Sequence, residues 1–207
     1  RSVVLNLKED AGRIAAERLA AQADVIVENY RPGVTRRLGI DYETLSKGRD
    51  DLIYCSISGY GQTGPSAGLP AYAPVIHASS GFDLAHISYQ AGRTRPDYCG
   101  IFIADVLTGT YAFGAIATAI AQRKATGRGQ TIDVSMLESM LSLTLIEMQA
   151  AQFAMPPQPS RPLFGPVETS DGYINIAVAS ERTFDGMARA AGRLDWFEDP
   201  RFKVYID

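Results

Sequence analysis

The first part of the sequence alternates between strand-like and helix-like segments, and this alternation constrains the fold more than any other feature. Three apolar runs predict strands, at residues 2–7, 23–28 and 52–58. Three intervening segments predict helices, at residues 10–22, 33–38 and 42–47, the last with Asp41 as its N-cap. Strands separated by helical segments of this length pair in parallel, with helices on the faces of the sheet. The sequence therefore predicts an α/β fold.

The sheet domain continues past residue 58 with a loop, a long helix and a further strand. Glycine and proline are frequent at 59–74, which predicts a loop. Further helices are predicted at residues 75–84, 106–124 and 136–153, and a strand at 131–134. Gly127 and Gly129 are expected to end the second of these helices by supplying left-handed backbone.

A proline-rich segment divides the chain into two domains. Residues 155–166 contain five prolines in twelve residues, too many for a packed element. We therefore expect a large domain at 1–153, a linker at 154–166 and the start of a smaller α+β domain at 167–207. In the smaller domain, Asp171-Gly172 predicts a hairpin turn, and 181–191 predicts a helix. Because the chain starts without Met and inside a strand-like run, we expect it to be part of a longer protein.

The composition argues against several classes of partner. Twenty Lys and Arg against 23 Asp and Glu give a net charge of −3, which gives no electrostatic reason to expect nucleic acid or an anionic membrane as partner. The longest uncharged stretch, 106–122, is predicted to be a buried helix rather than a membrane span. Cys55 and Cys99 match no metal or redox spacing. With no signal segment in the sequence, we expect a cytoplasmic protein.

The stretch GYGQTG at 59–64 fits the glycine pattern of dinucleotide-binding proteins. That pattern binds a pyrophosphate only if a helix opens at its third glycine. Here PSAGLPAYAP follows, which cannot open a helix. We interpret the stretch as a glycine-rich turn at the carboxyl end of a strand, where open α/β sheets bind ligands.

Asn29 and Tyr30 are expected at the carboxyl end of another strand, with Arg31, Arg36 and Arg37 close behind. The arginines either form a solvated basic surface or bind the phosphates of a nucleotide-like ligand.

The only two histidines, His77 and His86, have neither metal-ligand spacing nor a nucleophile motif beside them. We expect ordinary packed or half-exposed histidines and no metal site.

Asp105 is the one carboxylate in the apolar stretch FIADVLTG, and two roles are open to it. Aspartate is a preferred N-cap, and a helix is predicted from Val106 onward. A catalytic nucleophile is compatible with that position, because the helix dipole and backbone N–H groups hold a carboxylate ionised in apolar surroundings. The residues themselves do not choose between these roles.

Four long stretches, in order, resemble the family III CoA-transferases. They are VVLNLKEDAGR, ADVIVENYRPGVTRRLGIDYETL, LIYCSISGYGQTGP and IADVLTGTYAFGAIATAIAQRKATGRGQTIDVSMLES. The resemblance extends over essentially the whole chain, including TSDGYINIAVASERTF and DPRF. It implies a Rossmann-like large domain, an interlocked homodimer, and missing parts of both domains.

The resemblance also implies a chemistry for Asp105. Its carboxylate attacks an acyl-CoA thioester to give a mixed anhydride, and the released thiolate then forms an aspartyl-CoA thioester. A carboxylic acid accepts the CoA through a second anhydride. Covalent catalysis of this kind divides one difficult transfer into easier steps. The implied substrates are acyl-CoA, with coenzyme A as the carried group, and a carboxylic acid.

Further site residues follow from the same resemblance. CoA contacts fall on Leu5, Lys8, Asn29, Tyr30, Arg37 and Leu38. Lys8 and Arg37 suit the CoA phosphates, and Tyr30 suits the adenine. Tyr72 and Met136 match positions that line the acyl site in formyl-CoA transferase. Pro70 stands where that enzyme has lysine, which argues against a formyl or oxalyl substrate.

Two alternative functions are compatible with the same resemblance. The α-methylacyl-CoA racemases share the fold and exchange an α-proton with His and Asp. They carry Gly-His-Asp where this chain has Ala71-Tyr72-Ala73, so a proton-transfer base is missing. A non-catalytic CoA-binding protein is the second alternative, and it leaves Asp105 without a use.

Overall fold

The structure is a computed structural model that describes residues 1–90, 92–153, 163–200 and 202. The chain divides into two compact units, Arg1–Met155 and Pro156–Asp207. Most of the predicted linker at 154–166 lies outside the described residues. Its last residues, from Phe164, belong to a strand, so the regular structure of the second unit begins earlier than predicted.

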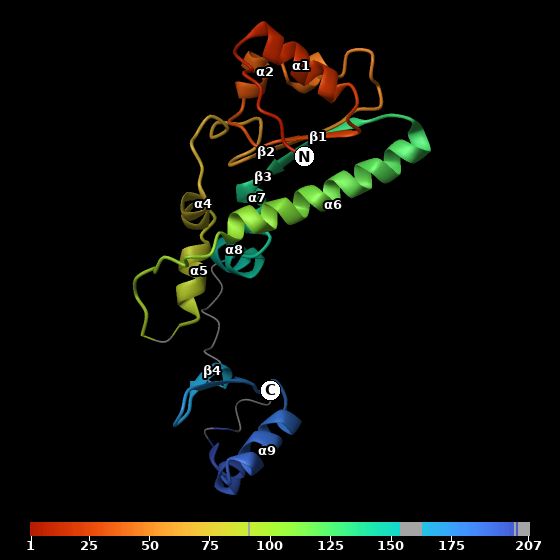
Figure 1. The fold of residues 1–207 in the computed structure, drawn as a ribbon. Helices are drawn as coiled ribbons and strands as arrows, with labels where there is room; N and C mark the ends of the chain where they lie inside the picture. The colour runs from red at the N-terminus through yellow and green to blue at the C-terminus, as the bar shows by residue number, and fades with distance from the viewer. Residues whose placement is uncertain (91, 154–162, 201, 203–207) are drawn as a thin grey trace. The chain divides into compact units, whose positions relative to one another are not determined.

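A parallel sheet of three strands forms the centre of the first unit (Figure 1). The strands are β1 (Val25–Glu28), β2 (Ile53–Ser58) and β3 (Gln130–Ser135), in the order β1-β2-β3. β2 pairs in parallel with both neighbours, so the predicted parallel sheet is confirmed. The central strand is also the most buried, because both of its edges are paired and Leu52 to Cys55 lie in the core.

The helices of the first part of the chain follow the prediction, whereas its first strand does not form. The helices are α1 (Asp10–Ala20), α2 (Val34–Leu38) and α3 (Tyr42–Leu45). Asp41 precedes α3 as predicted, but its side chain makes no cap hydrogen bond. The predicted strand at 2–7 is wrong: the segment pairs with no described strand, and Val4 is 99% exposed. A strand needs a neighbour for its backbone hydrogen bonds, and the described strands provide none for this segment.

Two segments predicted as single helices are each divided into two. The first forms α4 (Ala73–Ser79) and α5 (Phe82–Ser88), separated at Gly81, whose φ of 76° is left-handed. The second forms α7 (Met136–Leu141) and α8 (Leu145–Gln152). Between α7 and α8, the hydroxyl of Ser142 donates to the carbonyl of Ser139, which gives the backbone an alternative to continuing the helix.

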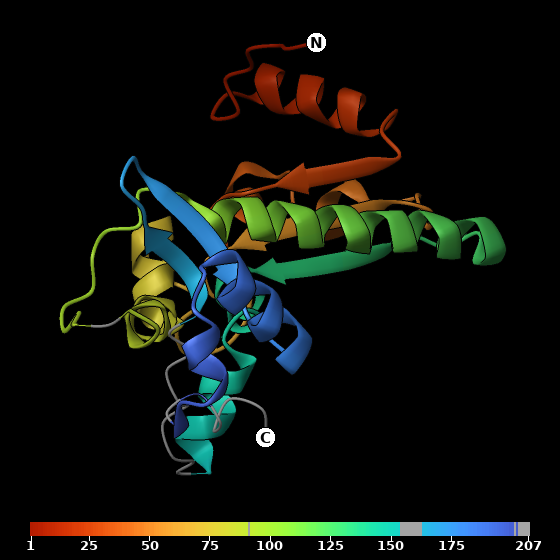
Figure 2. The ribbon, with the colours of Figure 1, turned by 90° about the horizontal axis from the view of Figure 1, so that it is seen from below.

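The long helix α6 (Ile103–Thr126) lies along one face of the sheet, and α1 and α2 lie on the opposite face of the sheet (Figures 1 and 2). It contacts β2 and β3, and Gly127 ends it with a left-handed φ of 72°, as predicted. The prediction of a buried helix holds only for the face that carries Ala104, Thr108, Ala112 and Ala119. Elsewhere α6 is open, and Phe113 is 75% exposed in this chain.

By length and composition alone, α6 is the one described helix that could cross a membrane. One such helix is weak support for a membrane span, since core helices of other proteins pass the same test. The expectation of no membrane partner therefore stays a prediction.

Two arginines hold the amino ends of the strands together. Arg49 donates to the carbonyls of Ala20, Ala21 and Ala23, which fixes the end of α1 to the turn before β2. Arg123, near the end of α6, donates to the Asp24 carbonyl and pairs with its carboxylate at 2.9 Å. Guanidinium groups suit this role because their donors spread in a fixed plane.

The second unit contains a hairpin and a helix, as predicted. β4 (Phe164–Glu168) and β5 (Tyr173–Ala177) pair antiparallel around the Asp171-Gly172 turn. The helix α9 (Glu181–Ala190) starts with a capping box between Ser180 and Thr183. A short 3₁₀ helix, Leu194–Phe197, follows, and the Phe197 ring packs edge-on against Phe184 with centroids 6.2 Å apart.

Gly129 has a different role from the one predicted. It does not adopt left-handed backbone. Instead its amide donates to the Asp50 carbonyl at 2.7 Å, and a Cβ at this position would collide with the backbone carbonyl of Leu52.

We therefore expect Gly129→Ala to lower the free energy of unfolding by at least about 2 kcal/mol, because backbone rather than a side chain would have to move. Chemical denaturation of the full-length protein measures this. The control is Gly114→Ala, which meets no atom within 4 Å and should be neutral or stabilising.

Tyr54 should make the stability of the protein depend on pH in the alkaline range. Its hydroxyl donates to the Ile40 carbonyl at 2.8 Å. Burial, followed by the nearby Glu28 carboxylate, raises the pKa of Tyr54 to about 12. A phenol in an unfolded chain has a pKa of about 10, so the stabilisation is complete below pH 10 and is lost between about pH 10 and 12. Denaturation at a series of pH values should show a shallower decline for Tyr54→Phe, whereas Tyr173→Phe, at an exposed site, should follow the parent protein.

Candidate active site

The carboxyl ends of the three parallel strands meet at one edge of the sheet. Asn29 and Tyr30 follow β1, Ser58 is the last residue of β2, and Met136 follows β3. Because the strands run in the same direction, these residues come together although they are far apart in the sequence. Open α/β sheets bind their ligands at this edge.

A cavity of about 340 Å³ lies at this edge. The strand ends, the loop before α4 and the first turn of α6 line it together. Its lining residues are Asn29, Tyr30, Arg31, Pro32, Ser58, Gly59, Leu69, Ala71, Tyr72, Asp105 and Met136. Five of the predicted site residues are among them, namely Asp105, Asn29, Tyr30, Tyr72 and Met136. The structure thus brings together the predicted nucleophile, both residues predicted for the acyl site and two predicted CoA contacts.

Asp105 lies inside α6 and does not cap it. The N-cap residue of α6 is Phe102, and no side chain bonds there as a cap, so the prediction of Asp105 as N-cap is wrong. Asp105 is the third residue of the helix, where the helix dipole still favours a negative charge. It is also exposed in this chain, contrary to the expected apolar surroundings. Its carboxylate therefore caps no helix in the described part of the chain and is open to a ligand.

One of the free backbone N–H groups at the amino end of α6 is hydrogen-bonded to His77 from α4. The amide of Ala104 donates to Nε2 of His77 at 3.2 Å, and the His77 ring is 2% exposed. The ring packs against Phe82 with centroids 5.5 Å apart. The prediction of a packed histidine is confirmed, and its helix-capping role is one that sequence reasoning missed. His86 is exposed, and its ring stacks on that of Phe82 with centroids 6.0 Å apart.

Hydrogen bonds fix the end of β1 against the end of β2. The Asn29 amide donates to the Ile57 carbonyl at 2.8 Å. The backbone amide of Tyr30 donates to the carboxylate of Glu28, which is itself buried, also at 2.8 Å. These bonds orient the chain at the point where Tyr30 and Arg31 enter the cavity wall.

The glycine-rich stretch forms a turn, as predicted, and no helix opens at its third glycine. Gly61 and Gly64 have φ values of 87° and 92°, which is left-handed backbone. The carboxylate of Asp133 accepts a hydrogen bond from the backbone amide of Gln62 at 2.8 Å, which ties the turn to β3. Close approach also shapes this loop, since a Cβ on Gly59 would collide with Ala71.

Four predicted CoA contacts do not line this cavity: Leu5, Lys8, Arg37 and Leu38. Lys8 and Arg37 are exposed, and Leu5 and Leu38 are half-buried. Arg31 lines the cavity, although the sequence argument favoured Arg37 over it. Neither arginine has an ion-pair partner in the part of the chain that the structure describes. The roles of all these residues stay predictions.

Sequence reasoning missed Ser58 and Leu69 as cavity residues. A place at the end of a strand could have pointed to Ser58, since Asn29 was found by that criterion. Leu69 lies in an irregular loop, whose path no sequence pattern specifies.

Within the described ranges, no three His, Cys, Asp or Glu side chains gather as metal ligands would, and the expectation of no metal stays a prediction.

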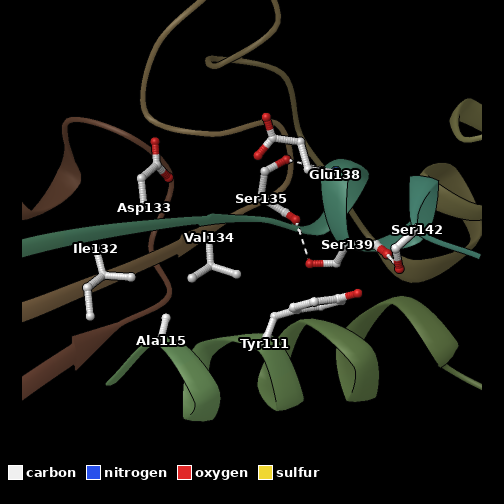
Figure 3. A pocket seen from close by; sticks show the side chains of 9 residues that line it. All are labelled: Tyr111, Ala115, Ile132, Asp133, Val134, Ser135, Glu138, Ser139 and Ser142. Atoms are coloured by element: carbon white, nitrogen blue, oxygen red, sulfur yellow. Dashed lines mark hydrogen bonds between the residues drawn. The ribbon is translucent and has the colours of Figure 1, made fainter. Parts of the chain in front are cut away.

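A second cavity, of about 370 Å³, lies between β3 and α6 (Figure 3). Ile132 and Val134 of β3 point toward Tyr111 and Ala115 of α6. The carboxylate of Asp133 points away from the helix. None of the predicted site residues lines this space. We therefore assign the candidate site to the cavity at the strand ends, which five of the predicted site residues line.

The fold and the site define an α/β protein with a carboxylate at the ligand-binding edge of a parallel sheet. Residues 1–206 match the family described as CoA-transferase family III. This chain belongs to that family.

Individual relatives agree with the family assignment. The chain is 36% identical over 97% of its length to an acetyl-CoA:oxalate CoA-transferase of Acetobacter aceti, and it covers 53% of that protein. It is 33% identical over 99% of its length to the mouse succinyl-CoA:glutarate CoA-transferase, of which it covers 48%. The chain thus spans about half the length of the curated relatives it matches. Among solved structures, it resembles a CAIB/BAIF family protein from Brucella suis, with a TM-score of 0.80 and 31% identity over 98% of this chain and 55% of that one.

Proposed function

We propose that the full-length protein transfers CoA from an acyl-CoA thioester to a carboxylic acid, with Asp105 as the nucleophile. The observation that carries this proposal is the common cavity, which places Asp105 beside Tyr72, Met136, Asn29 and Tyr30. Membership of CoA-transferase family III supports the reaction class. The identity of the acyl donor and of the acceptor acid is left open.

In the first half-reaction, the Asp105 carboxylate attacks the thioester carbonyl. The C–S bond breaks, the CoA thiolate leaves with its electron pair, and an aspartyl anhydride remains. The thiolate then attacks the Asp105 carbonyl of the anhydride and releases the first carboxylate product. Asp105 is left as an aspartyl-CoA thioester.

In the second half-reaction, the acceptor carboxylate attacks this thioester. A second anhydride forms and the thiolate leaves again. The thiolate attacks the acceptor's carbonyl, so a new acyl-CoA departs and the Asp105 carboxylate is regenerated. No net proton transfer is needed, which agrees with a cavity that no histidine lines.

CoA is proposed to extend from this cavity toward exposed basic residues. Arg37, in the last turn of α2, and Lys8 supply positive charge for the CoA phosphates. Leu5, Leu38 and the Tyr30 ring supply apolar contacts. We further propose that the protein is cytoplasmic, as expected from the sequence. We also propose that it forms a homodimer, a state that the family resemblance implies and that the exposed apolar side chains of α6 support.

A racemase is the less favoured alternative. Tyr72 stands between Ala71 and Ala73, and none of these three side chains is a proton-transfer base of the racemase pattern. His77 is the nearest substitute in the sequence, but its Nε2 already accepts from Ala104 and its ring is buried. A base must reach the proton it removes, and this ring is buried and already hydrogen-bonded within the fold.

Asp105 should become covalently modified during turnover. We expect acyl-CoA plus hydroxylamine to convert Asp105 into a hydroxamate, because hydroxylamine attacks the anhydride and thioester intermediates. Peptide mass spectrometry of the full-length protein measures the change. Asp105→Asn should lower kcat on the order of 1,000-fold or more while acyl-CoA still binds, since the exposed carboxylate is not used as a helix cap.

The control for this experiment is Asp50→Asn, which replaces an exposed carboxylate outside the cavity and should retain full activity. An unlabelled Asp105 together with exchange of the substrate's α-deuterium would indicate the racemase. CoA binding with neither reaction would indicate a non-catalytic binding protein.

Arg37 should affect the binding of CoA and leave the chemical step unchanged. We expect Arg37→Ala to raise KM for acyl-CoA about 10-fold with little change in kcat, because one charge-assisted contact to phosphate is lost. With an acyl-pantetheine substrate, which has no nucleotide phosphates, variant and parent should be equal. Arg18→Ala, an exposed arginine in the last turn of α1, is the matched control. An equal KM increase with acyl-pantetheine would exclude a phosphate contact.

A further inference from the structure

Ser58 carries a buried hydroxyl that the fold does not use. Its side chain is 4% exposed, and its Oγ has no hydrogen-bond partner among the described residues. Leaving a buried polar group unsatisfied costs about 1–3 kcal/mol, and such groups are uncommon in folded proteins. The position therefore needs an explanation other than stability.

The neighbouring serine on β3 shows what a structural hydroxyl does at this edge. Ser135 is paired with Ser58 in the sheet register, and its Oγ accepts from the Glu138 amide at 3.3 Å. That bond caps α7. Ser58 has no such helix end to bond, and it is one of the residues that line the cavity together with Asp105.

The other polar side chains of the cavity either already make a hydrogen bond within the protein or are exposed to water, unlike that of Ser58. The Asn29 amide already donates to Ile57. Arg31, Tyr30, Tyr72 and Asp105 are exposed, so water satisfies them when no ligand is bound. Ser58 thus supplies a buried donor for which the described residues provide no acceptor.

We propose that the Ser58 hydroxyl donates a hydrogen bond to the carbonyl oxygen of the acyl group attacked by Asp105, an inference that rests on the proposed function above. When the carboxylate forms its bond to the carbonyl carbon, the C=O electron pair moves onto this oxygen. The hydroxyl stabilises that negative charge and keeps its own proton. The carbonyl re-forms as the C–S bond breaks and the CoA thiolate leaves. A donor held in place before the reaction is effective because it needs no reorganisation.

The variant Ser58→Ala tests this role. In the full-length protein we expect kcat to fall about 100-fold, the effect typical of losing one such donor, with KM for acyl-CoA unchanged. In single-turnover experiments, the hydroxylamine-trapped acylation of Asp105 should slow by the same factor. The melting temperature without ligand should stay constant or rise, because the variant removes an unsatisfied buried hydroxyl.

Ser139→Ala is the matched control. Ser139 is also buried, but its hydroxyl donates to the Ser135 carbonyl at 2.8 Å. This variant should lower the melting temperature and leave the acylation rate of Asp105 unchanged.

The outcomes separate this inference from the proposed function. If the parent protein labels Asp105 and Ser58→Ala labels it equally fast, the role of Ser58 is overturned and the transferase proposal stands. A clearly lowered melting temperature for Ser58→Ala would also overturn it, by showing that the hydroxyl belongs to the fold. If even the parent fails to label Asp105, the proposed function itself fails, and the inference fails with it.

Discussion

Parallel pairing of β1, β2 and β3 is the interaction on which the candidate site depends. It places the ends of three strands at one edge, so that Asn29, Ser58 and Met136 line a single cavity. The register is as important as the direction. Successive side chains of a strand point to opposite faces, so a shift of β2 by one residue would turn Ser58 away from the cavity. The arginines at the other edge, Arg49 and Arg123, hold the amino ends of the strands and oppose such a shift.

The position of Asp105 depends on a second set of contacts, between helices. Ala73 and Ile76 of α4, Ala104 of α6, and Met136 and Met140 of α7 form one buried cluster. In the same region His77 accepts from the Ala104 amide and satisfies one of the free N–H groups at the start of α6. Because a histidine from another helix supplies this bond, the Asp105 carboxylate is not needed as a cap. It remains available to the cavity.

The sequence predicted the elements whose cause is local. The parallel sheet, the first three helices, the hairpin and Gly127 follow from periodicity and turn residues, and all are confirmed. Two of the failures have causes distant in the sequence. The segment 2–7 has strand-like residues but pairs with no described strand, and Gly129 is required by the approach of Leu52 rather than by its own φ. The two divided helices, in contrast, have local causes at Gly81 and Ser142.

The candidate site shows the same division between local and distant causes. Family motifs identified Asp105 and four other cavity residues, and the structure then added Ser58 and Leu69. A local pattern distinguishes Ser135 from Ser58, because Ser135 has Glu138 three residues later, the spacing of a helix N-cap, whereas Ser58 precedes a glycine-rich turn. The packing adds that the Ser58 hydroxyl has no partner among the described residues.

The two groups proposed for the reaction differ in exposure, and this difference suits their roles. Asp105 is exposed in this chain, so its charge carries no desolvation cost before a ligand arrives. Ser58 is buried, where a hydrogen bond is stronger because water does not compete for it. An acyl group that reaches Ser58 with its carbonyl oxygen would cover Asp105 and displace the water around it. The carboxylate would then lose its hydration only when the thioester is in place, which couples its activation to the binding of the substrate.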